Sequence, residues 1–174
     1  MKKYFVILIT NLLFLNIFTG CGYKPASVHA KKVLGDKIYT DVEIYLRDPE
    51  NSVLIKDAVN EAIVSRFKGK LTEKEKADTI LSVKLRGVSF SPLQYDKNGY
   101  VVYYRARVSL NIKYTNKEET KSFTVTGTYD FPIEPNAVIS DSKRFEAIRE
   151  SSKKALDQFI SKITITGYLK NRNI

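Results

Sequence analysis

The sequence is poor in the residues that most often carry catalysis and metal binding. It holds one cysteine, one histidine and no tryptophan among 174 residues. A single cysteine excludes an intramolecular disulfide and the cysteine-based zinc sites, which need two or more thiolates. A single histidine excludes His-rich metal sites and leaves little material for Ser-His-Asp or Cys-His catalysis. A Walker loop, a dinucleotide-binding glycine pattern and a nucleophile elbow are also missing. The sequence therefore predicts no metal and no cofactor, and it disfavours an enzyme.

The remaining candidates for acid–base chemistry are weak. His29 lies in a segment without a regular pattern, far from any predicted group of carboxylates. Asp41 and Glu43 share parity on a predicted strand, so they could form the buried carboxylate pair that a periplasmic hydrolase needs. The alternative is that both lie on the solvent face of that strand. A hydrolase stays open only if the two are buried together.

Charge of one sign is in excess. Lysine and arginine number 29 against 19 acidic residues, which gives a formal net charge of +10. A hydrophobic share of 43% and a charged share of 28% are typical of a folded protein, and the length suits one domain. The basic excess predicts an anionic partner: nucleic acid, anionic lipid or a membrane surface.

The one long apolar run stands at the beginning of the chain. Residues 1–3 are positively charged and residues 4–18 are mostly apolar, which is typical of a secretory signal peptide and too short for a membrane-spanning helix. Residues 18–21 (FTGC) resemble the bacterial lipobox. That resemblance implies cleavage before Cys21 and attachment of lipid to this cysteine. The alternative is an ordinary signal peptide followed by an unrelated cysteine.

The predicted processing decides the compartment. We expect residues 1–20 to be removed and the mature protein to leave the cytoplasm, so nucleic acid is not an expected partner. Gly22 follows the cysteine, where lipoproteins of diderm bacteria that stay in the inner membrane often have Asp. This resemblance favours the outer membrane, with a soluble body that faces the periplasm.

The rest of the sequence predicts a single α+β domain over residues 37–166. A lipidated tether at 21–36 precedes it and a frayed tail at 167–174 follows it. Apolar residues alternate, as in half-buried strands, at residues 38–46, 79–90, 100–114 and 120–131. They recur at helical spacing over residues 49–67 and 141–163. The order β-α-β-β-β-α predicts a four-stranded, mainly antiparallel sheet with two helices packed on one face.

Turn positions predict how the strands pair. Asn116 and Lys117 could form a two-residue turn, which would set Leu110 opposite Phe123. For the second and third strands, a register that matches Leu81 with Leu110 keeps the apolar residues on one face. A bulge is expected at Gly87, because the apolar phase shifts there.

The same register brings four cations together on the wet face of the sheet. Lys84 would lie opposite Arg107, and Arg86 opposite Arg105. Like charges directly opposite are destabilising, so the face is either a solvated surface whose side chains splay apart or a site for an anionic group. Arginine suits phosphate because its fork donates two parallel hydrogen bonds. Tyr103 shares this face and could lie under acyl or sugar groups.

With these features together, the chain resembles the LptE family of lipopolysaccharide-assembly lipoproteins. The resemblance rests on the lipobox that continues as CGY at 21–23, on the order of elements, and on the closing segment 135–163. In that segment, PNA at 135–137 is followed by RFEAIRE at 144–150, which leads into ALD at 155–157. The likeness covers residues 21 to about 165.

The resemblance implies a function without chemistry. Members of the family sit inside the outer-membrane β-barrel LptD as its plug, assist its assembly, bind lipopolysaccharide and help deliver it to the outer leaflet. The ligand of the four cations would then be the phosphates of lipid A and core. The choice of these four residues follows from the predicted strand pairing and not from the resemblance. Exposed aromatics often anchor interfaces, so we expect partner contacts at Tyr95, Tyr100 and Tyr103. The alternative is a scaffold lipoprotein of another secretion or envelope assembly.

Overall fold

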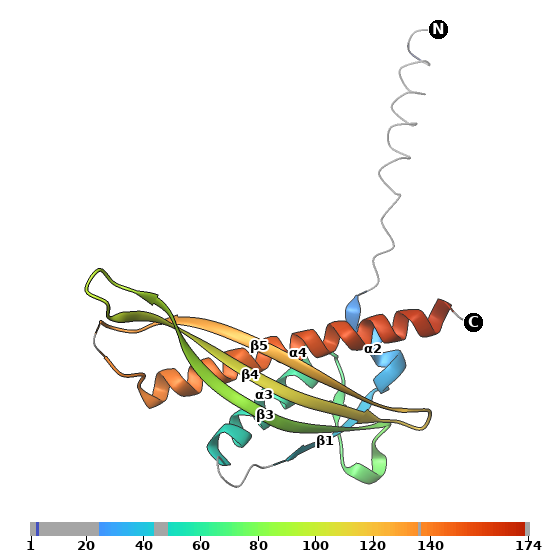
Figure 1. The fold of residues 1–174 in the computed structure, drawn as a ribbon. Coiled ribbons are helices and arrows are strands. Elements are labelled where there is room, and N and C mark those ends of the chain that lie inside the picture. The colour runs from blue at the N-terminus through green and yellow to red at the C-terminus, as the bar shows by residue number, and fades with distance from the viewer. Residues whose placement is uncertain (1–2, 4–24, 44–48, 136, 173–174) are drawn as a thin grey trace.

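The computed structural model describes residues 3, 25–43, 49–135 and 137–172 (Figure 1). Apart from Lys3, the predicted signal peptide lies outside the described residues, and so does Cys21. The elements are α2 (Ala26–Leu34), β1 (Lys37–Glu43), α3 (Pro49–Ser65), β2 (Lys70–Leu71), the 3-10 turn η2 (Lys74–Lys76), β3 (Thr79–Tyr95), β4 (Val101–Thr115), β5 (Thr120–Pro132) and α4 (Asp141–Arg172).

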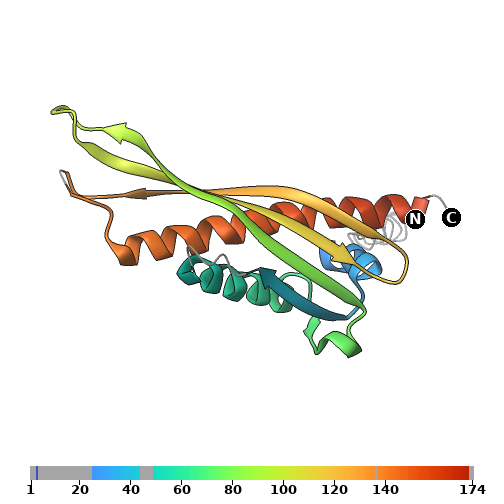
Figure 2. The ribbon, with the colours of Figure 1, turned by 60° about the horizontal axis from the view of Figure 1, so that its bottom comes forward.

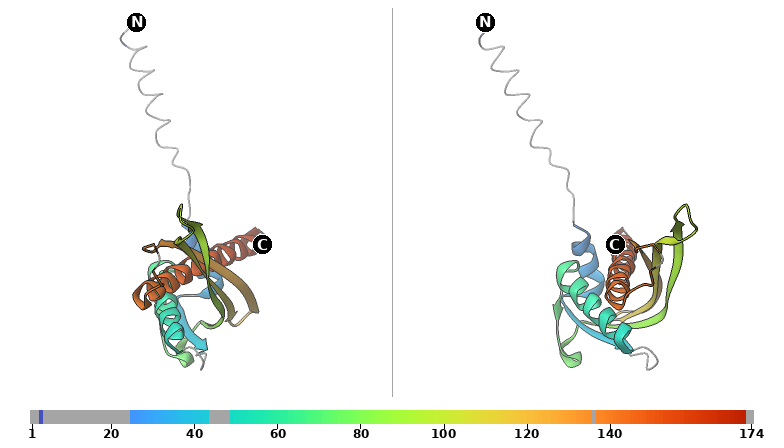
Figure 3. Two further views of the ribbon diagram at one scale, coloured as in Figure 1. Left: turned by 60° about the vertical axis from the view of Figure 1, so that its left-hand side comes forward. Right: turned by 90° about the vertical axis from the view of Figure 1, so that its left-hand side faces the viewer.

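The strands form one mixed sheet in the order β2-β1-β3-β4-β5. Strand β1 runs parallel to β2 and β3, whereas β3, β4 and β5 pair antiparallel. Figures 2 and 3 show the sheet curled, with the helices on its inner side. The predicted α+β class is confirmed. The described residues add one strand and one helix to the expected count, because β2 is only two residues long and α2 is short, and neither gives a clear periodic signal.

The core lies between the inner face of the sheet and the helices. On β4, alternate side chains are fully buried, from Ala106 through Val108 and Leu110 to Tyr114, while Arg107 between them is exposed. The predicted apolar stripes of the two long helices are also buried, at Ile55, Val59, Ala62, Ile63 and Phe67 around α3 and at Ile148, Ala155, Leu156, Phe159 and Ile163 on α4. Burial of these faces is the main source of stability for such a layered fold.

Two terminal predictions were wrong in the described residues. The supposed tether contains α2, whose Ala30, Val33 and Leu34 are buried in the core. The supposed frayed tail continues α4 as far as Arg172. Gly167, the first residue of the supposed tail, lies inside α4 at the point where α2 crosses it. A Cβ at Gly167 would lie 2.3 Å from the backbone oxygen of His29, so only glycine permits this approach.

The turn between β4 and β5 is longer than predicted. The side-chain oxygen of Asn116 accepts hydrogen bonds from the backbone N–H groups of Glu118 and Glu119, at 2.9 and 2.8 Å, and Thr115 pairs with Thr120. This Asx-type turn moves the register by two residues from the predicted one. Leu110 therefore pairs with Val125 and not with Phe123; the apolar faces are unchanged, because a shift of two preserves parity.

The turn between β3 and β4 is shorter than predicted, because β3 continues to Tyr95, beyond its predicted end at residue 90. Asp96 Oδ1 accepts hydrogen bonds from the backbone N–H groups of Asn98 and Tyr100, both at 2.9 Å. As a result Leu81 pairs with Tyr114, and the predicted pairing with Leu110 was wrong. The register does shift between Leu85 and Gly87, which confirms the predicted bulge.

Helix α4 covers both the inner face and the free edge of β5. Gln158 accepts a hydrogen bond from the backbone N–H of Thr126 at 2.9 Å, and Lys162 donates one to the backbone oxygen of Thr124 at 3.2 Å. Next to this edge, Gly127 faces the helix backbone: a Cβ there would lie 1.9 Å from the oxygen of Ser151. The absence of a side chain at Gly127 lets α4 approach the sheet.

We expect Gly127→Ala to lower the free energy of unfolding by about 3 kcal/mol, because the added methyl overlaps the backbone of α4. Gly87→Ala is the matched control: nothing lies within 4 Å of a Cβ there, so its effect stays below about 1 kcal/mol. Urea unfolding of the purified protein measures both. Equal effects would contradict the close approach of helix and sheet.

Candidate functional site

No helix among the described residues covers the outer face of the sheet (Figure 3). We call it the open sheet face. It is formed by the outward side chains of β3, the odd-numbered residues of β4 from 103 to 113 and the even-numbered residues of β5 from 120 to 130. Serine, threonine, lysine and arginine dominate it, and all four predicted cations lie on it or at its bulge: Lys84, Arg86, Arg105 and Arg107.

The four cations do not pair as predicted. Lys84 lies opposite Asn111, and Arg107 lies opposite Ser89. The Cα atoms of Lys84 and Arg107 are therefore roughly 13 Å apart along the sheet, at ~3.3 Å per strand residue. Arg86 occupies the bulge and has no direct opposite residue. The cations form a row along one face, because the true register differs from the predicted one by four residues.

Arg105 is neutralised by an acid on the neighbouring strand. Its Nε and Nη2 donate hydrogen bonds to the two carboxylate oxygens of Asp130, both at 2.7 Å, in the two-pronged geometry that favours arginine–carboxylate pairs. The Arg105 guanidinium holds the pKa of the Asp130 carboxyl below its ordinary value, mainly through this hydrogen bond. Asp130 in turn raises the pKa of Arg105.

Lys84 is neutralised in a similar way. Its Nζ lies 2.8 Å from Glu43 Oε1 on β1, next to it in the parallel register. Glu43 and Asp41 are both exposed. The two therefore do not form the buried carboxylate pair that the hydrolase alternative requires, and the structure places Glu43 in an ion pair instead.

Arg86 and Arg107 are the two cations of the row without an acidic partner among the described residues. Both are exposed. Arg107 lies between Ser89 on β3 and Thr128 on β5, so hydroxyl groups flank it on both sides. The described part of the open sheet face thus offers two guanidinium groups and a row of hydroxyls for an anionic group.

The three tyrosines gather at the far end of the β3–β4 hairpin. Tyr95, Tyr100 and Tyr103 are exposed by 57%, 45% and 38%, and Leu93, which the sequence did not single out, by 45%. Figure 1 shows this hairpin extending beyond the helices. We call these four residues the hairpin-tip cluster. Exposed aromatic side chains in one place are typical of an interface.

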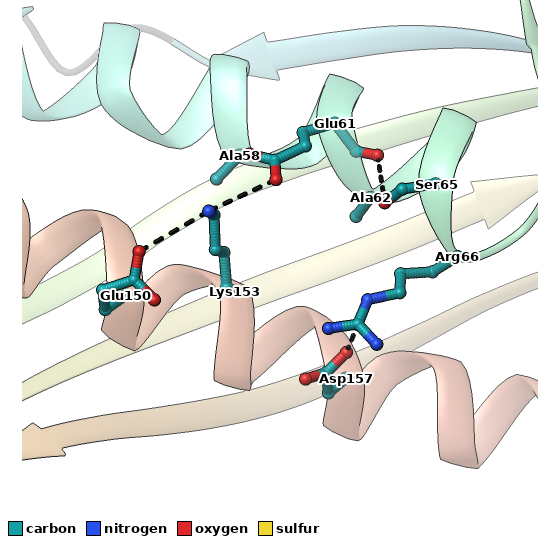
Figure 4. A pocket seen from close by; sticks show the side chains of 8 residues that line it. All are labelled: Ala58, Glu61, Ala62, Ser65, Arg66, Glu150, Lys153 and Asp157. Carbon is teal, nitrogen blue, oxygen red and sulfur yellow. Dashed lines mark hydrogen bonds and ion pairs between the residues drawn. The ribbon is translucent and has the colours of Figure 1, made fainter.

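A groove of about 220 Å³ lies between α3 and α4 (Figure 4). Lys153 bridges Glu61 at 3.2 Å and Glu150 at 3.5 Å, and Arg66 lies 3.7 Å from Asp157. The Lys153–Glu61 pair joins α4 to α3, and the Arg66–Asp157 pair joins α4 to the residue that follows α3. In the described ranges no group of three metal-binding side chains comes together, and no described helix is long and apolar enough to cross a membrane.

The lipopolysaccharide-assembly family model, LptE, matches residues 39–163. The chain belongs to the LptE family. The matched range contains β3, β4 and β5 with the open sheet face, and most of α4. This LptE-family protein is therefore a lipopolysaccharide-assembly lipoprotein, as the sequence resemblance implied.

Known structures resemble the fold at low sequence identity. Rare lipoprotein B from Shewanella oneidensis has 13% identity and a TM-score of 0.47, with 79% of this chain and 97% of that chain covered. Protein XCC0632 from Xanthomonas campestris has 13% identity and a TM-score of 0.48, with 88% and 94% covered. Lipoprotein B from Nitrosomonas europaea has 14% identity and a TM-score of 0.43, with 74% of this chain and 82% of that chain covered. No curated protein matches the chain.

Sequence reasoning missed the two acids that neutralise half of the row. Asp130 follows Thr126 and Thr128 at every second position of β5, so the sequence predicts that it lies on the outer face of the sheet. Its ion-pair partner could not be predicted, because the predicted two-residue turn places Arg105 opposite Thr128. An Asn followed by three further polar residues at 116–119 was the available signal for the longer turn.

We expect the Asp130 carboxyl to titrate below its ordinary value of 3.8. Because this pKa is depressed in the folded protein, the stabilisation by the Arg105 pair is complete above that pH and is lost as the pH falls through the folded pKa. NMR titration of the Asp130 carboxyl carbon measures this pKa. In Arg105→Gln the pKa should return toward the ordinary range, whereas Arg107→Gln should leave it unchanged; an unshifted Asp130 in the wild-type protein would contradict the pair.

Proposed function

We propose that this LptE-family protein is anchored by lipid at Cys21 to the outer membrane, faces the periplasm, and forms the plug of an LptD-type β-barrel through which lipopolysaccharide reaches the outer leaflet. The observation that carries the proposal is the family match over the sheet and α4. The lipobox at 18–21 supports the anchor. The role binds and guides a lipid and changes no covalent bond.

In this proposal the open sheet face binds the phosphates of lipopolysaccharide. Arg86 and Arg107 are the strongest candidates, because no described acid competes for their donors. Lys84 and Arg105 contribute less, since a phosphate must displace Glu43 or Asp130 from them. Serine and threonine hydroxyls on the flanking strands would complete the hydrogen bonds.

Replacing both Arg86 and Arg107 with Glu should weaken binding of purified lipopolysaccharide roughly tenfold or more, because each lost charge-assisted hydrogen bond contributes ~1.5–3 kcal/mol. The matched control is Lys56→Glu with Arg149→Glu, which makes the same charge change at exposed positions on α3 and α4. Calorimetric titration measures the affinity and circular dichroism checks the fold. Equal weakening in both double variants would show only a nonspecific charge effect and would remove the site.

The hairpin-tip cluster is the proposed contact with the barrel. Truncating Tyr95 and Tyr100 to Ala should reduce the amount of LptD-type barrel that copurifies with the tagged protein from solubilised outer membranes, because exposed aromatics anchor interfaces. Val53→Ala with Val64→Ala, two exposed apolar positions on α3, is the control. Copurification of a different envelope assembly in place of a barrel would favour the scaffold alternative.

A further inference from the structure

The C-terminal turns of α4 are apolar on two opposite sides. One side, with Ile163 and Gly167, is buried against the rest of the protein. The other side exposes Ile165 by 58%, Tyr168 by 54% and Leu169 by 48%, at the i, i+3, i+4 spacing that puts them on one helical face. A group of exposed large apolar side chains on one face normally marks an interaction surface. This second apolar face therefore needs a partner.

Helix α2 extends the same surface and holds it in place. The His29 ring packs edge-on against Tyr168, with 6.0 Å between ring centroids, and the neighbouring Val28 is exposed by 41%. We call Val28, Ile165, Tyr168 and Leu169 the end patch. The β4–β5 turn braces it: Asn116 donates a hydrogen bond to the backbone oxygen of Val33 at 2.7 Å.

The two helical segments that form the end patch carry only basic charged residues. The segments 26–34 and 161–172 contain lysine and arginine but neither aspartate nor glutamate. Lys31 pairs with Asp36, and Lys170 pairs with Glu118 on the β4–β5 turn; both pairs are exposed and thus weak. Tyrosine and aliphatic side chains beside basic residues are typical of surfaces that lie in the headgroup region of an anionic membrane.

The number of residues between Cys21 and α2 limits how far the lipid anchor can lie from the end patch. Pro25 is the fourth residue after Cys21, and four residue steps span at most ~14 Å when fully extended. Acyl chains on Cys21 would therefore enter a bilayer close to the first turn of α2, next to His29 and Tyr168. The tip of the β3–β4 hairpin, which carries the hairpin-tip cluster, lies at the opposite end of the fold from the C-terminal turns of α4 (Figure 1).

We propose that the end patch rests in the headgroup region of the same leaflet that holds the acyl chains of Cys21. The inference rests on the lipid anchor of the proposed function. Anchor and patch then form two contacts with one membrane, and together they fix the orientation of the long helix α4. The hairpin-tip cluster is thereby held away from that leaflet.

The natural absence of tryptophan gives a clean test. Leu169→Trp places a single reporter in the end patch; Tyr95→Trp at the hairpin tip and Val64→Trp on α3 are controls with similar exposure. The full lipidated proteins are reconstituted in vesicles of phosphatidylethanolamine and phosphatidylglycerol, with and without brominated acyl chains. We expect bromolipid to quench Leu169→Trp at least about threefold more than either control, because only the patch enters the interface.

The mass of the N-terminal peptide, measured on the same samples, separates the two hypotheses. Acylated Cys21 with no preferential quenching at position 169 overturns the membrane contact and leaves the patch to a protein partner. Equal quenching at all three positions also overturns it. Preferential quenching without acylation supports the patch while contradicting the anchor of the proposed function.

Discussion

The fold depends on the close packing of one long helix across the apolar face of a curled sheet. The fully buried alternate residues of β4 give α4 a continuous apolar surface, and Gly127 removes the side chain that would hold the two backbones apart. Because one face of the sheet is used for this contact, the other is left to water and to ligands. The division of the sheet into an apolar inner face and a cationic outer face thus follows from the same packing.

Strands, helices and faces were predictable because they depend on local periodicity. The alternation along β4, the helical stripe of α4 and the bulge at Gly87 are all readable from residue type and are present in the structure. Registers were not, because they depend on turn lengths. Those lengths are set by the Asn116 and Asp96 side chains, which bind backbone N–H groups and leave no periodic trace.

The candidate site shows the same limit. Parity placed the cations on the wet face correctly, but only the pairing identifies which of them are already satisfied. Asp130 and Glu43 bind Arg105 and Lys84, which leaves Arg86 and Arg107 as the strongest proposal for an anionic ligand. Helix α2 was not predicted for a related reason, because its nine residues are too few for a clear period.

The way α4 covers the free edge of β5 also limits how this protein can assemble with others. An exposed edge strand invites another strand to extend the sheet, and the barrel proposed as the partner of this protein would offer such strands. Here Gln158 and Lys162 already occupy the edge groups of Thr126 and Thr124. A strand from another protein would have to break both hydrogen bonds before it could pair with β5. Association at this edge is therefore expected to use side-chain contacts and not backbone hydrogen bonds between strands.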